Sequence, residues 1–224
     1  EAYCPGCLYP IRETPCPICR EAKVTHDRKQ AKEDARVELA LGGKRHAIQY
    51  VRTNFIVLKS NSKALTTIES FDPSTNSLYL YSQTNETKYS FGNGTGKTFL
   101  AVLAIRPYVY QGMRAEFIDL ASLFRELRAV DDAGREAARV RGVALSPILV
   151  LDDLGATKDT EWSKQIIFDI IQTRYTAGIH GLVITGNFSL DQLEARWKEG
   201  RVVSRLRELC TVICLDGIPD WRKV

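Results

Sequence analysis

The chain has 224 residues, of which 44% are hydrophobic, 26% charged and 9% aromatic. These proportions are typical of a globular protein with one sizeable core and an appendage, and they exclude disordered and fibrous classes. The net charge of +4 is compatible with nucleic-acid contact, although a solvated surface of mixed charge gives the same total. No apolar run approaches the ~20 residues that span a bilayer, and the start lacks a signal pattern, so we expect a cytoplasmic protein without a membrane partner.

Four of the six cysteines lie close together at the start of the chain, in two Cys-x-x-Cys pairs. They are Cys4, Cys7, Cys16 and Cys19. Each pair directs two thiolates at one point, and two pairs supply the tetrahedral four-sulfur set that Zn²⁺ accepts in a closed structural site. We therefore predict a small zinc-binding module. Iron in the same site and free or redox thiols are the alternatives.

A charged, alanine-rich stretch follows at residues 20–45 and carries an incomplete apolar stripe, with Gly42 and Gly43 as a stop signal. It predicts a helix that joins the zinc module to the rest of the chain. Its basic residues are mixed with acidic ones, which favours a solvated face over a nucleic-acid patch. Residues 1–45 form the first predicted unit and residues 46–224 the second.

Short apolar segments that alternate with helical stretches fill most of the second unit. We predict strands at residues 88–91, 115–118, 148–151, 182–185 and 211–215. This alternation is typical of an α/β fold with a five-stranded parallel sheet covered by helices. Polar residues gather at the carboxyl ends of these strands, where ligands bind in open α/β sheets. Residues 46–88 are the least informative part of the chain.

A glycine-rich loop at residues 91–98 leads directly into an apolar stretch. Glycines let successive backbone N–H groups converge on phosphate oxygens, and the N-terminus of the following helix adds further donors. The expected phosphate-binding residues are Gly92, Asn93, Gly94, Thr95, Gly96, Lys97 and Thr98. Lys97 would reach the β- and γ-phosphates, and the Thr98 hydroxyl would bind Mg²⁺.

One position departs from the full phosphate-loop pattern, because Phe91 stands where the first glycine belongs. Either the loop is one residue short, or Gly92 takes the role of the first glycine and one residue is missing before Gly96. We favour the second interpretation.

The segment at residues 148–153 is an apolar strand that ends in Asp152 and Asp153, which is a Walker B pattern. Asp152 would hold Mg²⁺ and Asp153 would act as general base on the attacking water. An acidic turn at the end of a strand is the alternative. The next strand ends at Asn187, whose amide would orient the same water, unless it only caps a turn.

The ordered set of motifs resembles the DnaC/IstB-like AAA+ ATPases, which include bacterial and phage helicase loaders and the ATPase helpers of some transposons. The motifs are Gly-Thr-Gly-Lys-Thr, Leu-Val-Leu-Asp-Asp-Leu-Gly-Ala, Ile-Thr-Gly-Asn-Phe-Ser-Leu-Asp-Gln-Leu and Arg-Val-Val-Ser-Arg-Leu. They cover residues 91–224. The resemblance implies an AAA+ core without a helical lid, binding of ATP and Mg²⁺, and assembly into a ring or spiral oligomer.

The resemblance also implies roles for single residues. Lys97 and Thr98 look like the Walker A pair, Asp152 and Asp153 like the Walker B pair, and Asn187 like sensor I. Arg205 resembles the arginine finger that completes the site of a neighbouring subunit, although a surface salt bridge fits the same sequence. Arg222 resembles the second sensor arginine.

Residues 120–145 occupy the place of an extra helix that lines a single-strand channel in the initiator and loader branch. Arg125 and Arg128 are therefore expected to contact DNA phosphates, or else to be exposed arginines without that role. In such loaders an N-terminal module grips the replicative helicase. The leading hypothesis is an ATP-dependent loader of a hexameric DNA helicase onto single-stranded DNA. The alternatives are a transposition helper and an ATP-binding adaptor that does not hydrolyse.

Overall fold

The structure is a computed structural model of the 224-residue chain. It describes residues 2–3, 10–11, 17–40, 62–83, 94–156, 158–198 and 200–216. Within α1 (Pro17–Ala40), side chains are described for residues 23–32 and 34–35.

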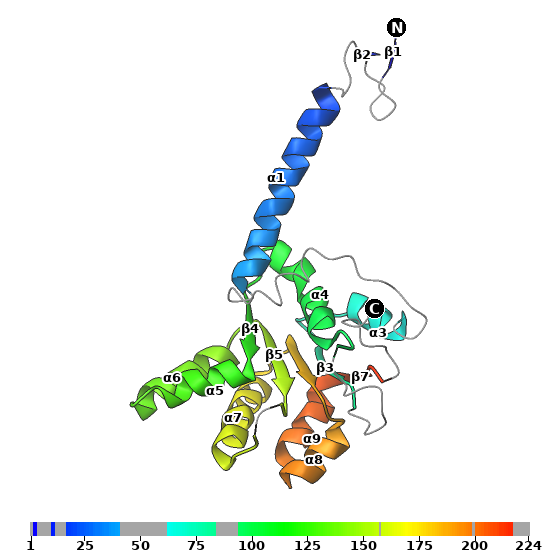
Figure 1. The fold of residues 1–224 in the computed structure, drawn as a ribbon. Coiled ribbons are helices and arrows are strands. Elements are labelled where there is room, and N and C mark those ends of the chain that lie inside the picture. Colours follow the sequence, from blue (N-terminus) through cyan, green and yellow to red (C-terminus); the bar gives the residue numbers. More distant parts are fainter. Residues whose placement is uncertain are drawn as a thin grey trace.

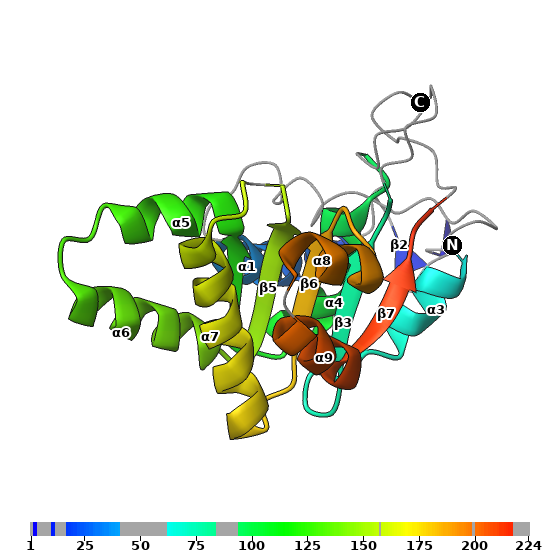
Figure 2. The same cartoon turned by 90° about the horizontal axis from the view of Figure 1, so that it is seen from below.

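Five parallel strands form a single sheet in the order β4-β5-β6-β3-β7 (Figures 1 and 2). They are β3 (Ser77–Tyr81), β4 (Ala115–Asp119), β5 (Ile148–Leu154), β6 (Leu182–Gly186) and β7 (Cys210–Cys214). The three inner strands are almost continuously buried, as expected for a sheet that is covered on both faces. The predicted α/β fold with a five-stranded parallel sheet is therefore confirmed.

Helices cover both faces of the sheet, so the domain has three layers (Figure 2). One face packs against α3 (Ser62–Glu69) and α4 (Lys97–Tyr110). The other face packs against helices that follow β4, β5 and β6 in the chain. These are α5 (Leu120–Arg128), α6 (Ala133–Ala144), α7 (Glu161–Ala177), α8 (Leu190–Trp197) and α9 (Gly200–Leu209).

The predicted bounds agree with four strands to within a few residues, and the fifth described strand of the sheet is β3, which was not predicted. Residues 88–91 lie outside the described residues. The place between β6 and β7 is taken by Ser77–Tyr81, where Leu78, Tyr79 and Leu80 are fully buried. The apolar run at residues 78–81 is typical of a strand, but its distance from the glycine-rich loop kept it from being assigned to the sheet.

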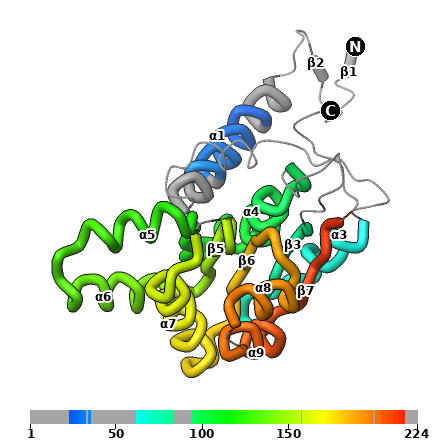
Figure 3. The backbone as a smooth tube through the Cα atoms, turned by 60° about the horizontal axis from the view of Figure 1, so that its bottom comes forward, coloured from blue at the N-terminus to red at the C-terminus, as the bar shows by residue number. Residues whose placement is uncertain are grey.

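The predicted linker helix is present as α1, and it lies beside α4 (Figures 1 and 3). Before it, β1 (Ala2–Tyr3) and β2 (Pro10–Ile11) pair in an antiparallel manner. Cys4, Cys7 and Cys16 lie outside the described residues, and Cys19 lies in α1 without a described side chain. The zinc module therefore stays a prediction.

The segment at 120–145 forms two helices instead of one, and they project as a hairpin at the β4 edge of the sheet (Figures 1 and 2). Each begins at an aspartate, Asp119 or Asp132, whose carboxylate accepts backbone N–H bonds of the first turn. In the described part of the chain, no helix is both long and apolar enough to cross a membrane.

Candidate nucleotide-binding site

The order of the strands brings the predicted motifs to the same end of the sheet, where the parallel strands have their carboxyl ends. β6 lies between β5 and β3, and all three strands run in the same direction. Their carboxyl ends therefore carry the Walker B aspartates, the sensor segment and Ser82 in a row. The helix that begins at Lys97 follows the phosphate loop, so the residues predicted from the Walker A, Walker B and sensor I motifs are neighbours.

The described part of the phosphate loop has the backbone that phosphate binding requires. Gly94 and Gly96 have positive φ values of 78° and 88°, a region that side chains with a Cβ rarely enter. Gly96 is the N-cap of α4 and offers no side-chain acceptor to the first turn of the helix. The first turn of α4 therefore has no side-chain cap from Gly96, at the end of the helix where anions bind.

Lys97 is buried, with 9% of its surface exposed, and its Nζ donates to the Ser82 hydroxyl at 2.9 Å. Ser82 is also buried and lies 3.1 Å from the Thr95 hydroxyl, Oγ to Oγ1. These contacts connect the end of β3 to the glycine-rich turn. Ser82 is thus a residue of the site that sequence reasoning missed.

Phe91 lies outside the described residues, so both interpretations of the irregular phosphate loop stay predictions. In the described part of the chain, β3 ends at Tyr81 and Ser82 contacts Lys97. Residues 82–93 separate this strand from Gly94 in the sequence. Gly92 and Asn93 also lie outside the described residues, so their predicted role stays a prediction.

A hydroxyl and a carboxylate meet where Mg²⁺ was predicted. The Thr98 hydroxyl donates to Asp152, at 3.0 Å from Oδ1 and 3.3 Å from Oδ2. Asp152 is buried with 5% exposure, and its Oδ1 also accepts from the Thr185 hydroxyl at 2.7 Å. Oxygen ligands from one carboxylate and one hydroxyl are what Mg²⁺ uses beside nucleotide phosphates. The donor set therefore fits the predicted metal.

The two aspartates differ in burial, and β5 has an irregularity in its register between Leu151 and Leu154. Asp153 is exposed and has a φ of 69°, which is rare for a residue other than glycine. Its N–H donates to the Thr185 hydroxyl at 2.9 Å, and Asn187 Nδ2 donates to its Oδ1 at 3.3 Å. Strain of this kind is typical of functional sites. Thr185, which joins both aspartates, is the second residue that sequence reasoning missed.

Asn187 also has a buried Oδ1 without a hydrogen-bond partner among the described residues. A buried polar atom without a partner is costly unless water or a ligand satisfies it. This orphaned acceptor beside Asp153 fits a site that holds an ordered water.

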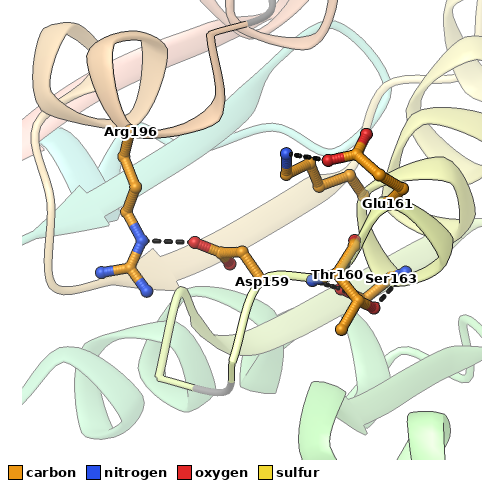
Figure 4. Close-up of polar contacts among 6 residues, drawn as sticks. Asp159, Thr160, Glu161, Ser163 and Arg196 are labelled. Carbon is orange, nitrogen blue, oxygen red and sulfur yellow. Dashed lines mark hydrogen bonds and ion pairs between the residues drawn. The ribbon is translucent and has the colours of Figure 1, made fainter.

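The loop after Asp153 contacts Phe188 and α8, which follow the sensor strand β6. Asp159 pairs with Arg196 of α8, as Figure 4 shows, and Arg196 Cζ lies 4.6 Å from the ring centroid of Phe188. Gly155 has a φ of 83°, and a Cβ there would lie 2.8 Å from the Phe188 ring. The loop ends in a capping box between Thr160 and Ser163 (Figure 4). Few substitutions would fit this segment.

Arg205 is not part of this cluster. In the described part of the chain its contacts are with residues of α7 and α9, on the opposite face of the sheet from α4. A separate position agrees with the predicted action on a neighbouring subunit and does not test it. Arg222 lies outside the described residues.

Arg125 and Arg128 are both exposed on α5. Arg125 Nη2 donates to the Ser122 hydroxyl at 2.9 Å, and Arg128 Cζ lies 4.9 Å from the ring centroid of Trp162. Their predicted contact with DNA stays a prediction.

Similar proteins have been described. The replicative helicase loader DnaI of Bacillus subtilis (strain 168) is 27% identical over 163 residues, which are 66% of this chain and 52% of that protein. An ATP-binding protein of insertion sequence IS5376 from Geobacillus stearothermophilus is 27% identical over 99 residues, 44% of this chain and 39% of that protein. The chain thus spans about half or less of the length of these relatives.

A crystal structure of the DnaC helicase loader has a TM-score of 0.60 and 29% identity, and the match covers 74% of this chain and 98% of that one. The model of the IstB-like ATP binding proteins matches residues 79–213, which include β3, the phosphate loop, the Walker B strand and the sensor strand. The resemblance inferred from the motifs is therefore confirmed, and the chain belongs to the family of IstB-like ATP binding proteins.

Proposed function

We propose that the chain binds ATP at the carboxyl ends of β3, β5 and β6 and hydrolyses it within an assembly of several subunits. The observation that carries this proposal is the convergence of four sequence segments at one site, which supply Ser82, the pair Lys97 and Thr98, the pair Asp152 and Asp153, and Asn187. Lys97 would hold the phosphates as a buried cation. Mg²⁺, when bound by Thr98 and Asp152, would neutralise developing charge on the phosphates.

Asp153 is the proposed general base, because it is exposed beside the site while Asp152 is buried. Its unusual backbone and its bond to Asn187 fix the carboxylate where a water could be deprotonated. Arg205 would act on the nucleotide of the adjacent subunit, so hydrolysis would depend on assembly.

Hydrolysis is tested by phosphate release from wild type and Asp153→Asn, with and without single-stranded DNA. We expect the substitution to lower the rate by roughly 10²- to 10⁴-fold, the contribution of a general base, while ATP binding persists. Asn replaces the carboxylate with an amide of the same size, so the fold is preserved. Equal, negligible rates for both proteins would favour the non-hydrolysing adaptor.

We further propose that the chain loads a replicative helicase onto single-stranded DNA, with the helix α1 and the residues before it as the helicase-binding part. The similarity to two proteins described as helicase loaders supports this choice. The relative from an insertion sequence supports the alternative, a transposition helper.

Co-purification with the replicative hexameric helicase of the same host separates these two functions. Retention of the helicase by the full chain in the presence of ATP is the expected result. Failure to retain it, together with ATP-dependent binding to duplex DNA, would favour the transposition helper.

A zinc site at Cys4, Cys7, Cys16 and Cys19 remains part of the proposed helicase-binding module. The antiparallel pair β1 and β2 supports it, because the two strands enclose the chain segment that carries the first Cys-x-x-Cys pair.

A further inference from the structure

The Arg205 guanidinium lies between two aromatic side chains of α7. Its Cζ is 5.2 Å from the ring centroid of Phe168 and 5.5 Å from that of Tyr175. These two residues are seven positions apart, or about two helical turns, so they lie on the same face of α7. Both distances are within the range in which a cation is attracted to an aromatic face. The rings therefore fix the guanidinium at the interface between α7 and α9.

Hydrogen bonds within this interface hold both the guanidinium and one of the rings in place. Arg205 Nη1 donates to the Arg201 carbonyl at 3.1 Å. The Tyr175 hydroxyl donates to both carboxylate oxygens of Glu208, each at 3.0 Å. This bond raises the pKa of Tyr175 above its ordinary value. The ring that supports Arg205 is thus held in place by a residue of α9.

The bond between Tyr175 and Glu208 also affects the charge of Arg205. Glu208 is three residues after Arg205 on α9, a spacing at which an ion pair ordinarily forms on a helix. Among the described contacts of this carboxylate is the Tyr175 hydroxyl, which lies 3.0 Å from each oxygen, and no ion pair with Arg205 is present in the described part of the chain. By contrast, Arg207 pairs with Asp191 and Glu194 of α8.

Aromatic partners differ from carboxylates in a way that matters for phosphate binding. A carboxylate neutralises a guanidinium and occupies its N–H donors, whereas a ring holds the group through its face and leaves the edge donors to other acceptors. Arg205 Nε is buried and has no hydrogen-bond partner in the described part of the chain. The arrangement therefore holds a positive charge in place without neutralising it with a carboxylate.

We propose that Phe168 and Tyr175 are positioning residues that hold Arg205 ready for the phosphates of a nucleotide bound by a neighbouring subunit. This inference rests on the proposed role of Arg205 between subunits.

The test is a mixing experiment with assembled full-length protein, in which kcat and KM for ATP are measured. Phe168→Leu keeps an apolar side chain but removes the ring. We expect it to lower kcat roughly 10- to 100-fold with KM unchanged, because a displacement of about 1 Å can cost about 100-fold. Phe168→Tyr keeps the ring and should retain the wild-type kcat. Gln165→Ala, at an exposed position one turn earlier on α7, is the matched control.

Mixing separates a positioning defect from a folding defect. Lys97→Ala subunits cannot hydrolyse but still provide Arg205, so they should restore hydrolysis when mixed with Arg205→Ala subunits and equally when mixed with Phe168→Leu subunits. A misfolded protein would not be rescued. No recovery with Arg205→Ala would reject the role of Arg205 between subunits, and with it the basis of the inference. Recovery with Arg205→Ala, combined with a wild-type rate or an unrescued low rate for Phe168→Leu, would overturn the inference alone.

The role of Tyr175 has its own readout. Tyr175→Phe keeps the ring but releases Glu208, which can then pair with Arg205, so kcat should fall. Adding Glu208→Gln removes the competing charge and should restore kcat. A double variant as slow as Tyr175→Phe would contradict the proposed function of this bond.

Discussion

Thr185 connects the two aspartates of the site through a single hydroxyl. The hydroxyl donates to Asp152 and accepts from the N–H of Asp153, and the residue is 1% exposed. One side chain therefore sets the orientation of the predicted metal ligand and of the strained backbone at the predicted general base.

Replacing Thr185 with valine removes this hydroxyl at nearly constant shape. We expect the free energy of unfolding to fall by about 1–3 kcal/mol, because the buried Asp152 carboxylate loses a hydrogen-bond donor and the Asp153 N–H loses its acceptor. We also expect kcat for ATP hydrolysis to fall roughly 10- to 100-fold through misplacement of both carboxylates. Urea unfolding and phosphate release measure the two effects. Thr185→Ser keeps the hydroxyl, and if it behaved like the valine variant the hydrogen bonds would not be the cause.

At the residue scale, the sequence predicted the site residues that belong to known motifs. It did not predict those whose role depends on the three-dimensional arrangement. Lys97, Thr98, Asp152, Asp153 and Asn187 were all predicted, and the structure places them at one edge of the sheet. Thr185 and Ser82 were not predicted as site residues. The role of Thr185 depends on the irregularity in β5, and that of Ser82 depends on which strand enters the loop; neither follows from spacing.

Among the elements, the strands with isolated apolar runs were predictable and the first strand of the sheet was not. β4, β5, β6 and β7 each follow a helical stretch and were placed within a few residues of their observed bounds. β3 was missed because the twelve residues 82–93 separate it from Gly94, whereas a phosphate loop normally follows its strand directly. The α5–α6 hairpin was expected as one helix, and Asp132 begins the second.

In the part of α1 whose side chains are described, polar groups connect the helix to α4. Tyr110 of α4 donates to Asp34 Oδ1 at 2.8 Å, and Gln30 Nε2 donates to the Tyr110 hydroxyl at 3.2 Å. Residues 23–29 of α1 are exposed, so α1 buries little apolar surface over that length. Burial, and next the bond to Asp34, raise the pKa of Tyr110 to about 12 from its ordinary value of 10.0. The hydrogen bond from Tyr110 to Asp34 therefore contributes fully to stability below about pH 10, and its contribution is lost as the pH rises through about 12.

Tyr110→Phe should loosen α1 without unfolding the domain. A hydrogen bond to a charged group contributes about 1.5–3 kcal/mol, and each 1.4 kcal/mol corresponds to a tenfold change. Amide hydrogen exchange in residues 23–35 should therefore become at least about tenfold faster. Tyr108→Phe is the control on the same helix, because the Tyr108 hydroxyl bonds to the Phe71 carbonyl and not to α1. Unchanged exchange after Tyr110→Phe would show that other contacts hold α1.

For the whole molecule, nucleotide binding should appear as thermal stabilisation. Mg²⁺ and ATP at about 100 times the dissociation constant stabilise a folded protein by about 2.7 kcal/mol, and a domain of this size gains about 2–4 °C in Tm per kcal/mol. We expect a rise of roughly 5–10 °C in wild type and none in Lys97→Ala. Lys63→Ala, at an exposed position on α3, is the control and should behave as wild type. A full shift in Lys97→Ala would refute the role assigned to this lysine.

α4 extends from the nucleotide-binding site to the helix α1. It has 14 residues and a length of about 21 Å at ~1.5 Å per residue. Its first residue is Lys97 in the phosphate loop, and its last is Tyr110, which holds α1. Pro107 lies between them and has no N–H for the Leu103 carbonyl, so the helix lacks one rung there. Pro107 thus interrupts the hydrogen-bond ladder of α4 between the nucleotide site at its first turn and the tyrosine that contacts α1 at its last.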